Sequence, residues 1–241
     1  MSDLKNVLQG RHEVLPGQPG VLMLTVINFL MSCRSVQFLN KLLLSDLIMM
    51  SNSLETFLLC SAALANLTSM VPQSLTCVSS TKLIHILLSH PASSASSVYI
   101  LEQLVTIFVN LAKVPPARKQ MLQSNVLQFL FNIFSLCEGK VEESVIKAAT
   151  ERTVSKAAIA LARLCLDPVI ADTVVDMGGL EKLFPLAEVS NSCNETIRIA
   201  ALAAIKTISV YSSVTDNLNT SSSELYYSTS EIPTSSLESF V

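Results

Sequence analysis

Apolar residues in this chain occur in short runs of helical length that are separated by turn-forming residues. The clearest stretch is 154–188, VSKAAIALARLCLDPVIADTVVDMGGLEKLFPLAE. In it an alanine-rich segment runs into Asp-Pro, a second apolar segment follows, and a third begins after Gly-Gly. A helix that is apolar on more than one face needs cover on more than one side. The pattern therefore predicts short helices that fold only as parts of a repeating unit.

The segments AALANLTSM (62–70), TIFVNLAKV (106–114) and IALARLCLD (159–167) align with one another, with weaker copies at 25–33 and 203–211. We define the aligned position as the residue that these copies share, in steps of 38, 44, 53 and 44 residues; it is occupied by Asn28, Asn66, Asn110, Arg163 and Thr207. A second landmark supports this register, because Leu83, Leu127 and Leu180 each lie 17 residues after an aligned residue. A polar insertion near 137–144 accounts for the longest step. A helical period of about 40–47 residues is typical of armadillo and HEAT arrays.

Prolines follow the aligned position by five or six residues, where they end one helix or start the next; they are Pro72, Pro115, Pro116 and Pro168. Gly178-Gly179 suits a sharp turn before the last helix of its unit. The pattern AAIALARLC…DPVIADTVVDMGGLEKLFPL resembles the armadillo repeat, A-x-x-A-L-x-N-L, a Pro-marked corner and G-G-L-x-x-L-x-x-L. The resemblance implies an all-α fold, an armadillo-type right-handed superhelical solenoid of about 4–5 repeats with a disordered C-terminal tail.

We predict three parts: an N-terminal extension (1–20), the armadillo-repeat array (21–211) and a disordered Ser/Thr-rich tail (212–241). The tail holds 14 Ser or Thr among 30 residues, four acidic residues and no Lys or Arg. Such a segment buries too little apolar surface to offset its ordering entropy. The chain then ends in Glu238, Ser239, Phe240 and Val241, which match a class I PDZ ligand. Such a peptide adds a strand to a sheet edge while backbone N–H groups hold its terminal carboxylate.

Composition excludes several other classes of protein. Half of the 241 residues are hydrophobic and 15% are charged, and the formal net charge is −3, so no basic excess points to nucleic acid. The longest apolar run, 21–31, is shorter than the roughly 20 residues that cross a bilayer. Six dispersed cysteines without a C-x-x-C pair fit buried thiols and a cytoplasmic protein. We find no catalytic, phosphate-binding, cofactor-binding or metal-ligating motif, and therefore expect no enzyme.

The armadillo resemblance also implies a peptide-binding groove. In that family the Asn of L-x-N-L faces a concave surface and bonds the backbone of an extended partner; Asn66 and Asn110 match this position, and Asn28 matches it weakly. Arg163 and Lys156, with Arg152, would add positive charge for an acidic partner segment. Arg and Thr at two aligned positions, and the absence of Trp, depart from the nuclear-import adaptors. The alternative is that these Asn side chains bond locally inside the array.

The stretches CSAALANLTSM, KAAIALARLCLDP and LESFV resemble the C-terminal armadillo region of the Inscuteable family. The resemblance implies a scaffold of asymmetric cell division, recruited to the cell cortex, that joins PDZ-containing Par-complex proteins to the spindle-orientation machinery. A Pins/LGN-type partner is also implied, but in that family its binding segment precedes the array, and residues 1–20 are short for it. A catenin-like junctional adaptor, or a generic armadillo peptide-binding adaptor, is the alternative.

Overall fold

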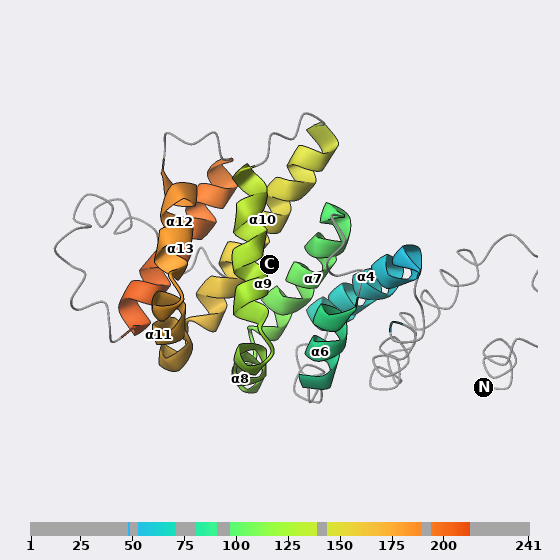
Figure 1. The fold of residues 1–241 in the computed structure, drawn as a ribbon, viewed down its shortest axis with the longest axis horizontal. Coiled ribbons are helices and arrows are strands. Elements are labelled where there is room, and N and C mark those ends of the chain that lie inside the picture. The colour runs from blue at the N-terminus through green and yellow to red at the C-terminus, as the bar shows by residue number, and fades with distance from the viewer. Residues whose placement is uncertain are drawn as a thin grey trace, which may run out of the picture.

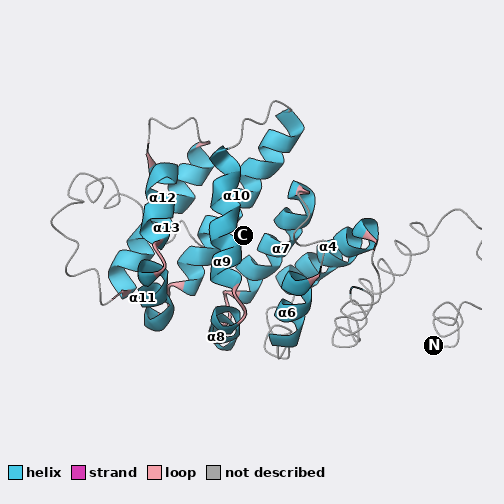
Figure 2. Cartoon of the chain, in the orientation of Figure 1, coloured by secondary structure: helices cyan, strands magenta, loops and turns pink. Residues whose placement is uncertain are grey.

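Every regular element in the described part of the chain is a helix. The computed structural model describes residues 48, 53–70, 81–90, 97–138, 144–188 and 194–212 (Figures 1 and 2). The α-helices are α4 (Leu54–Met70), α6 (Thr81–Ser89), α7 (Val98–Leu111), α8 (Pro115–Gln123), α9 (Val126–Phe134), α10 (Ser144–Leu164), α11 (Pro168–Asp176), α12 (Gly179–Ala187) and α13 (Glu195–Tyr211). A 3-10 turn, η3 (Ser135–Glu138), follows α9. The predicted all-α class is confirmed for these residues.

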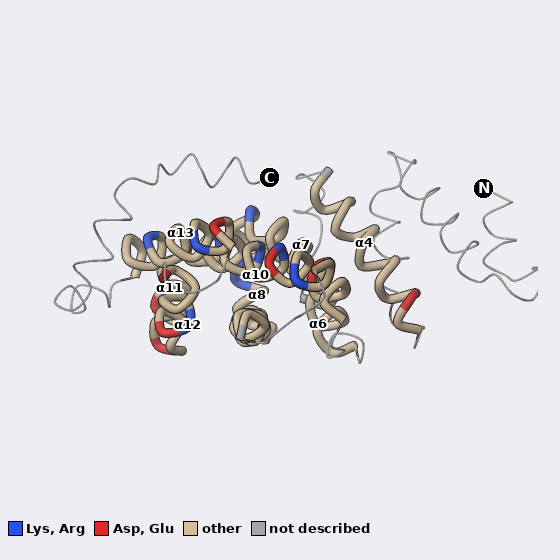
Figure 3. Tube along the Cα trace, turned by 90° about the horizontal axis from the view of Figure 1, so that it is seen from above, with Lys and Arg blue, Asp and Glu red and all other residues tan. Residues whose placement is uncertain are grey.

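The helices form two layers. The long helices α4, α7, α10 and α13 stand side by side in one row, and each packs on its neighbours in that order. The shorter helices α6, α9 and α12 lie in front of this row in Figure 1 and below it in Figure 3. Helices α8 and α11 connect the layers at the lower edge of Figure 1. Helices α10 and α13 are each preceded in the chain by shorter helices, of which α9 packs against α10 and α12 packs against α13.

Small side chains allow the long helices to approach one another closely. Alanines of α10 and α13 are almost completely buried where these two helices meet their neighbours: Ala157, Ala158, Ala160, Ala162, Ala200, Ala201 and Ala204. Because these side chains are short, the backbones can come near each other, and the larger Leu, Ile and Phe side chains fill the space between the layers. The apolar excess noted in the sequence is thus one continuous core running through the described helices.

The unit α8–α9–α10 is repeated by α11–α12–α13 with the same local geometry. Helices α8 and α11 both begin at a proline five residues after an aligned residue, where the missing N–H costs nothing. Helices α9 and α12 are both preceded by a residue in the left-handed conformation, Asn125 (φ 58°) and Gly178 (φ 70°). Leu127 and Leu180 are then buried in the first turn of each helix, as Leu83 is in α6. The predicted register, corner prolines and glycine turn are confirmed in these units.

Several predicted features lie outside the described residues. They are the extension 1–20, the apolar run 21–31 with Asn28, Pro72, and the tail beyond residue 212 with Glu238, Ser239, Phe240 and Val241. Helix α13 ends at Tyr211. The boundaries of the three predicted parts stay predictions.

Candidate protein-binding face

The exposed sides of α4, α7, α10 and α13, opposite α6, α9 and α12, form what we call the long-helix face (Figure 3). On α7, partly or fully exposed positions recur every three or four residues, at Tyr99, Gln103, Thr106 and Val109; the residues between them are buried except Leu101, which is partly exposed. The spacing is that of one helix stripe, so these side chains share a surface. Lys156 and Arg163 lie on this face, because they donate to Thr106 Oγ1 and to the carbonyl oxygen of Val109. The aligned register predicts the same side of α4 for Asn66.

The aligned residues join neighbouring long helices in a repeated way. Asn110 of α7 donates from Nδ2 to the carbonyl oxygen of Ala65 (3.2 Å) and to Oγ1 of Thr68 (3.1 Å), both on α4. Arg163 of α10 donates from Nη1 to the carbonyl oxygen of Val109 on α7 (3.1 Å). Each acceptor carbonyl belongs to the residue just before the aligned residue of the preceding long helix. The register found in the sequence thus corresponds to a ladder of helix-to-helix hydrogen bonds.

The two asparagines that match the armadillo pattern differ in accessibility. Asn110 is 5% exposed, and its side-chain amide donates to α4. Its bonds are therefore made inside the array, which was the alternative to binding a partner peptide. Asn66 is exposed on α4. The ladder does not extend to the next aligned residue, since Thr207 donates to the carbonyl of Ala203 in its own helix. Of the two, Asn66 is the one accessible to a partner.

A buried carboxylate binds two of the basic residues on this face. Glu102 of α7 accepts from Arg152 through Nε (2.9 Å) and Nη2 (3.1 Å), and from Lys156 Nζ (3.1 Å), both on α10. Lys156 also donates to Thr106 Oγ1 (3.0 Å). Burial raises the pKa of Glu102, but the hydrogen bonds and charges of Arg152 and Lys156 outweigh it and hold the pKa below its usual value. The positive charge predicted here is therefore partly neutralised within the protein.

A second group of cations surrounds the carboxyl end of α7. We call Lys113, Arg118 and Arg163 the basic cluster. Arg118 of α8 donates from Nε to the carbonyl oxygen of Ala112 (2.7 Å), next to the Val109 carbonyl that Arg163 binds. Cations are favourable at the negative end of a helix dipole. Burial, followed by the nearby charge of Arg163, lowers the pKa of Lys113, so these two cations lie close together.

Sequence reasoning did not single out Glu102, Lys113 or Arg118. Glu102 lies eight residues before the aligned Asn110, and its partners are about fifty residues away in the chain. The i, i+4 spacing of Arg152 and Lys156 was the only available signal, and it does not name their partner. Lys113 and Arg118 lie on either side of Pro115 and Pro116, and the sequence around them does not distinguish them from ordinary surface charges.

Metal-ligand clusters and membrane-spanning helices are absent from the described residues. Within them, no group of three or more His, Cys, Asp or Glu side chains is arranged to hold a metal ion. None of the helices in these ranges has both the length and the apolar character that a bilayer crossing requires.

These observations define a two-layered, helical repeat protein with a polar long-helix face. The chain matches the family model described as "Protein inscuteable C-terminal" over residues 33–225, and it belongs to that family. It is 30% identical over 160 residues to a protein inscuteable homolog of Mus musculus and 29% identical over 160 residues to one of Homo sapiens. Each alignment covers 65% of this chain but only 28% of the relative.

Proposed function

We propose that the chain is a non-enzymatic adaptor of asymmetric cell division that binds other proteins through its long-helix face and its C-terminal segment. The observation that carries this proposal is the match to the Inscuteable C-terminal family, which includes all of the described helices. Membership of a family of adaptor proteins supports protein binding rather than catalysis.

The helical units are those of an armadillo-type solenoid in this proposal. The repeated order of a proline-started helix, a helix after a left-handed residue and a long alanine-rich helix supports it. In such an array the long helices line the surface that receives an extended peptide. The exposed Asn66 and Tyr99 are the side chains with which we expect a partner backbone to make contact.

The C-terminal residues Glu238 to Val241 are proposed as a PDZ ligand, which requires that Val241 carries the free carboxylate. The implied partner is a PDZ-containing scaffold of the Par polarity complex, which would recruit the chain to the cell cortex. A link to a Pins/LGN-type spindle-orientation protein would complete the adaptor role.

If the long-helix face and the C-terminal segment bind different partners, a variant of each should lose a different set of bound proteins. We would capture partners from lysates of polarised dividing cells, using the native chain, the face variant Asn66→Ala/Tyr99→Ala, the tail variant Val241→Asp and the control Lys182→Ala. Lys182 is exposed on α12, in the other layer. Quantitative mass spectrometry should report loss of PDZ proteins with the tail variant and of a different set with the face variant.

The tail assignment has a direct test as well. A labelled peptide of residues 232–241 with a free carboxylate should bind a purified polarity PDZ domain in fluorescence anisotropy, and its amidated form should not. The adaptor proposal fails if all four chains capture the same proteins and both peptides behave alike.

A further inference from the structure

Arg152 of α10 binds the buried Glu102 with only one edge of its guanidinium. Its Nε and one hydrogen of Nη2 donate to the two carboxylate oxygens, at 2.9 Å and 3.1 Å. A guanidinium has five N–H donors, so both hydrogens of Nη1 and the second hydrogen of Nη2 remain. The Arg152 side chain is 54% exposed, whereas that of Glu102 is 10% exposed. The ion pair therefore holds a second guanidinium edge, formed by Nη1 and Nη2, in a fixed orientation near the surface.

The group around Glu102 carries an excess positive charge. Lys156 Nζ donates to the same carboxylate (3.1 Å), so two cations share one anion and the group has a formal charge of +1. Glu151, the neighbour of Arg152 in the chain, does not cancel this charge at the same place. It accepts a hydrogen bond from Asn194 (2.8 Å), just before α13, and is therefore directed away from α7.

Tyr99 and Gln103 of α7 lie beside this guanidinium edge. They are one helical turn apart, so their side chains share a stripe of the helix. Tyr99 and Arg152 each lie eleven residues before an aligned residue, which places them at the same level of two adjacent helices. The hydrogen bonds and charge of Glu102 raise the pKa of Arg152, and the nearby Tyr99 side chain adds to this effect. Tyr99 is 42% exposed and Gln103 is partly exposed, and among the described residues neither side chain makes a hydrogen bond.

These donors fit a carboxylate. A guanidinium edge gives two parallel N–H bonds to the two oxygens of a carboxylate, and a phenol hydroxyl and an amide can donate to the same oxygens. A carboxylate also carries one negative charge, which balances the formal charge of +1 on the group around Glu102. A phosphomonoester, with a charge of about −1.5 to −2, would leave an excess of negative charge.

We propose that the Nη1–Nη2 edge of Arg152, together with Tyr99 and Gln103, binds the side chain of an Asp or Glu in an extended partner peptide. The inference rests on the proposed function for the binding of a peptide to the long-helix face, and it adds the chemistry of one residue of that peptide. Glu102 and Lys156 are positioning residues here, since they fix the guanidinium without contacting the partner.

Peptide display on the full chain tests the proposal. A phage library of random peptides of about twelve residues is selected on the native chain, and peptides that bind the face variant Asn66→Ala/Tyr99→Ala equally well are discarded. Among the remaining peptides, Asp and Glu should be enriched at one position at least about fivefold over the unselected library. If no peptide depends on the face, the peptide-binding part of the proposed function fails together with this inference. If such peptides are found but have no enriched acidic position, only this inference fails.

A double-mutant cycle then identifies Arg152 as the partner of the acidic residue. The best peptide is synthesised with a fluorescent label, with its acidic residue retained or replaced by Gln. For the native chain, fluorescence anisotropy should show about tenfold weaker binding of the Gln peptide, since hydrogen bonds to charged groups are strong. Arg152→Lys keeps the positive charge and an ion-pair partner for Glu102 but lacks the second edge. With this variant the difference between the two peptides should shrink to about twofold or less.

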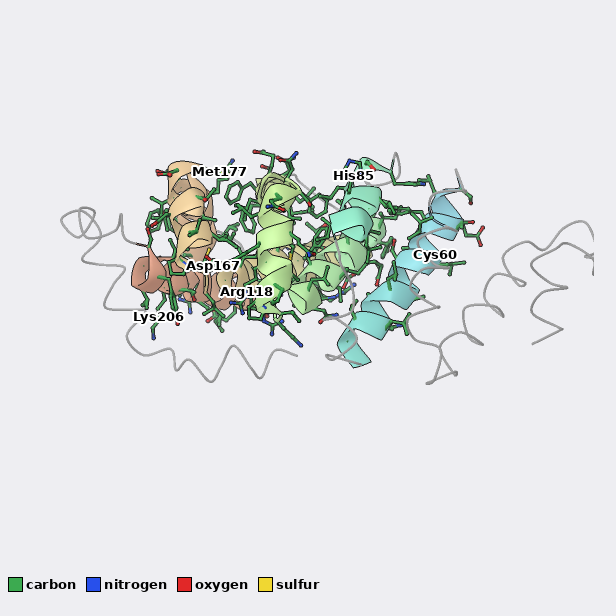
Figure 4. The ribbon with its side chains drawn as sticks, turned by 90° about the horizontal axis from the view of Figure 1, so that it is seen from below. Cys60, His85, Arg118, Asp167, Met177 and Lys206 are labelled. Carbon is green, nitrogen blue, oxygen red and sulfur yellow. The ribbon has the colours of Figure 1, made fainter. Side chains whose placement is uncertain are left out.

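Two other variants accompany this cycle. Tyr99→Phe removes only an exposed hydroxyl, and should weaken binding of the acidic peptide about threefold while leaving the Gln peptide unaffected. Lys182→Gln removes a positive charge from α12 and should behave like the native chain. It lies in the layer of short helices, where Figure 4 shows His85 and Met177 on the side away from Lys206. Circular dichroism checks that every variant is folded.

Three results overturn the proposal. The first is an equal cost of the Gln replacement in the native chain and in Arg152→Lys. The second, which does not depend on any change at Arg152, is an equal effect of Tyr99→Phe on both peptides. The third is a peptide with phosphoserine at the enriched position that binds the native chain more tightly than the acidic peptide, because it would make phosphate the preferred ligand.

Discussion

Replacing Asn110 by alanine tests whether this residue holds the long helices together. The change removes two hydrogen bonds from α7 to α4, those to the Ala65 carbonyl and to Thr68 Oγ1. A buried hydrogen bond contributes about 1 kcal/mol net. Thr68 keeps its own bonds to backbone carbonyls of α4, so no hydroxyl hydrogen is stranded. We therefore expect Asn110→Ala to lower the free energy of unfolding by about 2 kcal/mol.

Urea denaturation of the full chain, followed by far-ultraviolet circular dichroism, measures this loss. With an m value of about 2 kcal/mol/M, the midpoint should fall by about 1 M. Asn66→Ala is the matched control: it is the same substitution at the aligned position of α4, but on an exposed side chain, and should change stability by no more than about 0.5 kcal/mol. Thr68→Val should be less than additive with Asn110→Ala, because both remove the same bond. Equal midpoint shifts for the two asparagine variants would refute the reasoning.

Three further predictions concern the buried residues. Glu102→Gln should destabilise the chain most near neutral pH: the pKa of Glu102 is lowered in the fold, so its contribution is present above the unfolded value of about 4.3 and is lost as pH falls. Thermal melts of both chains at pH 7 and pH 3 check this, and a difference independent of pH would contradict it. Gly179→Ala should lower the melting temperature by several degrees, because a Cβ there would lie 2.5 Å from a side-chain carbon and 2.8 Å from the carbonyl oxygen of Val174. Burial raises the pKa of Cys60 to about 11 and of Cys165 to about 12. Near pH 8 the native thiols should therefore alkylate more slowly than in the urea-unfolded chain, about 100-fold for Cys60 and about 1,000-fold for Cys165, as peptide mass spectrometry can measure. Similar rates in both states would be inconsistent with this burial.

The sequence alone determined the helical class and the repeat register. Helix starts at Pro115 and Pro168 and the turn at Gly178 follow from local backbone restrictions, which act within a few residues of the chain. Buried leucines such as Leu127 recur at a fixed offset because each unit must present the same apolar side to its neighbours. The helix starts, the turn and the buried leucines can therefore be predicted from the repeats in the sequence alone.

The tertiary structure decided what the polar residues do. Asn66 and Asn110 occupy the same aligned position, yet one is exposed and the other is buried against the preceding helix. Glu102 pairs with Arg152 and Lys156, about fifty residues away, because α7 and α10 pack side by side. Which charged side chains form ion pairs depends on the rotation of each packed helix about its axis and on the distance between helices. The hydrophobic pattern of the sequence does not determine either quantity precisely enough to identify the pairs. The ion pairs of Arg152 and Lys156 with Glu102 could thus be identified only once the helices were packed.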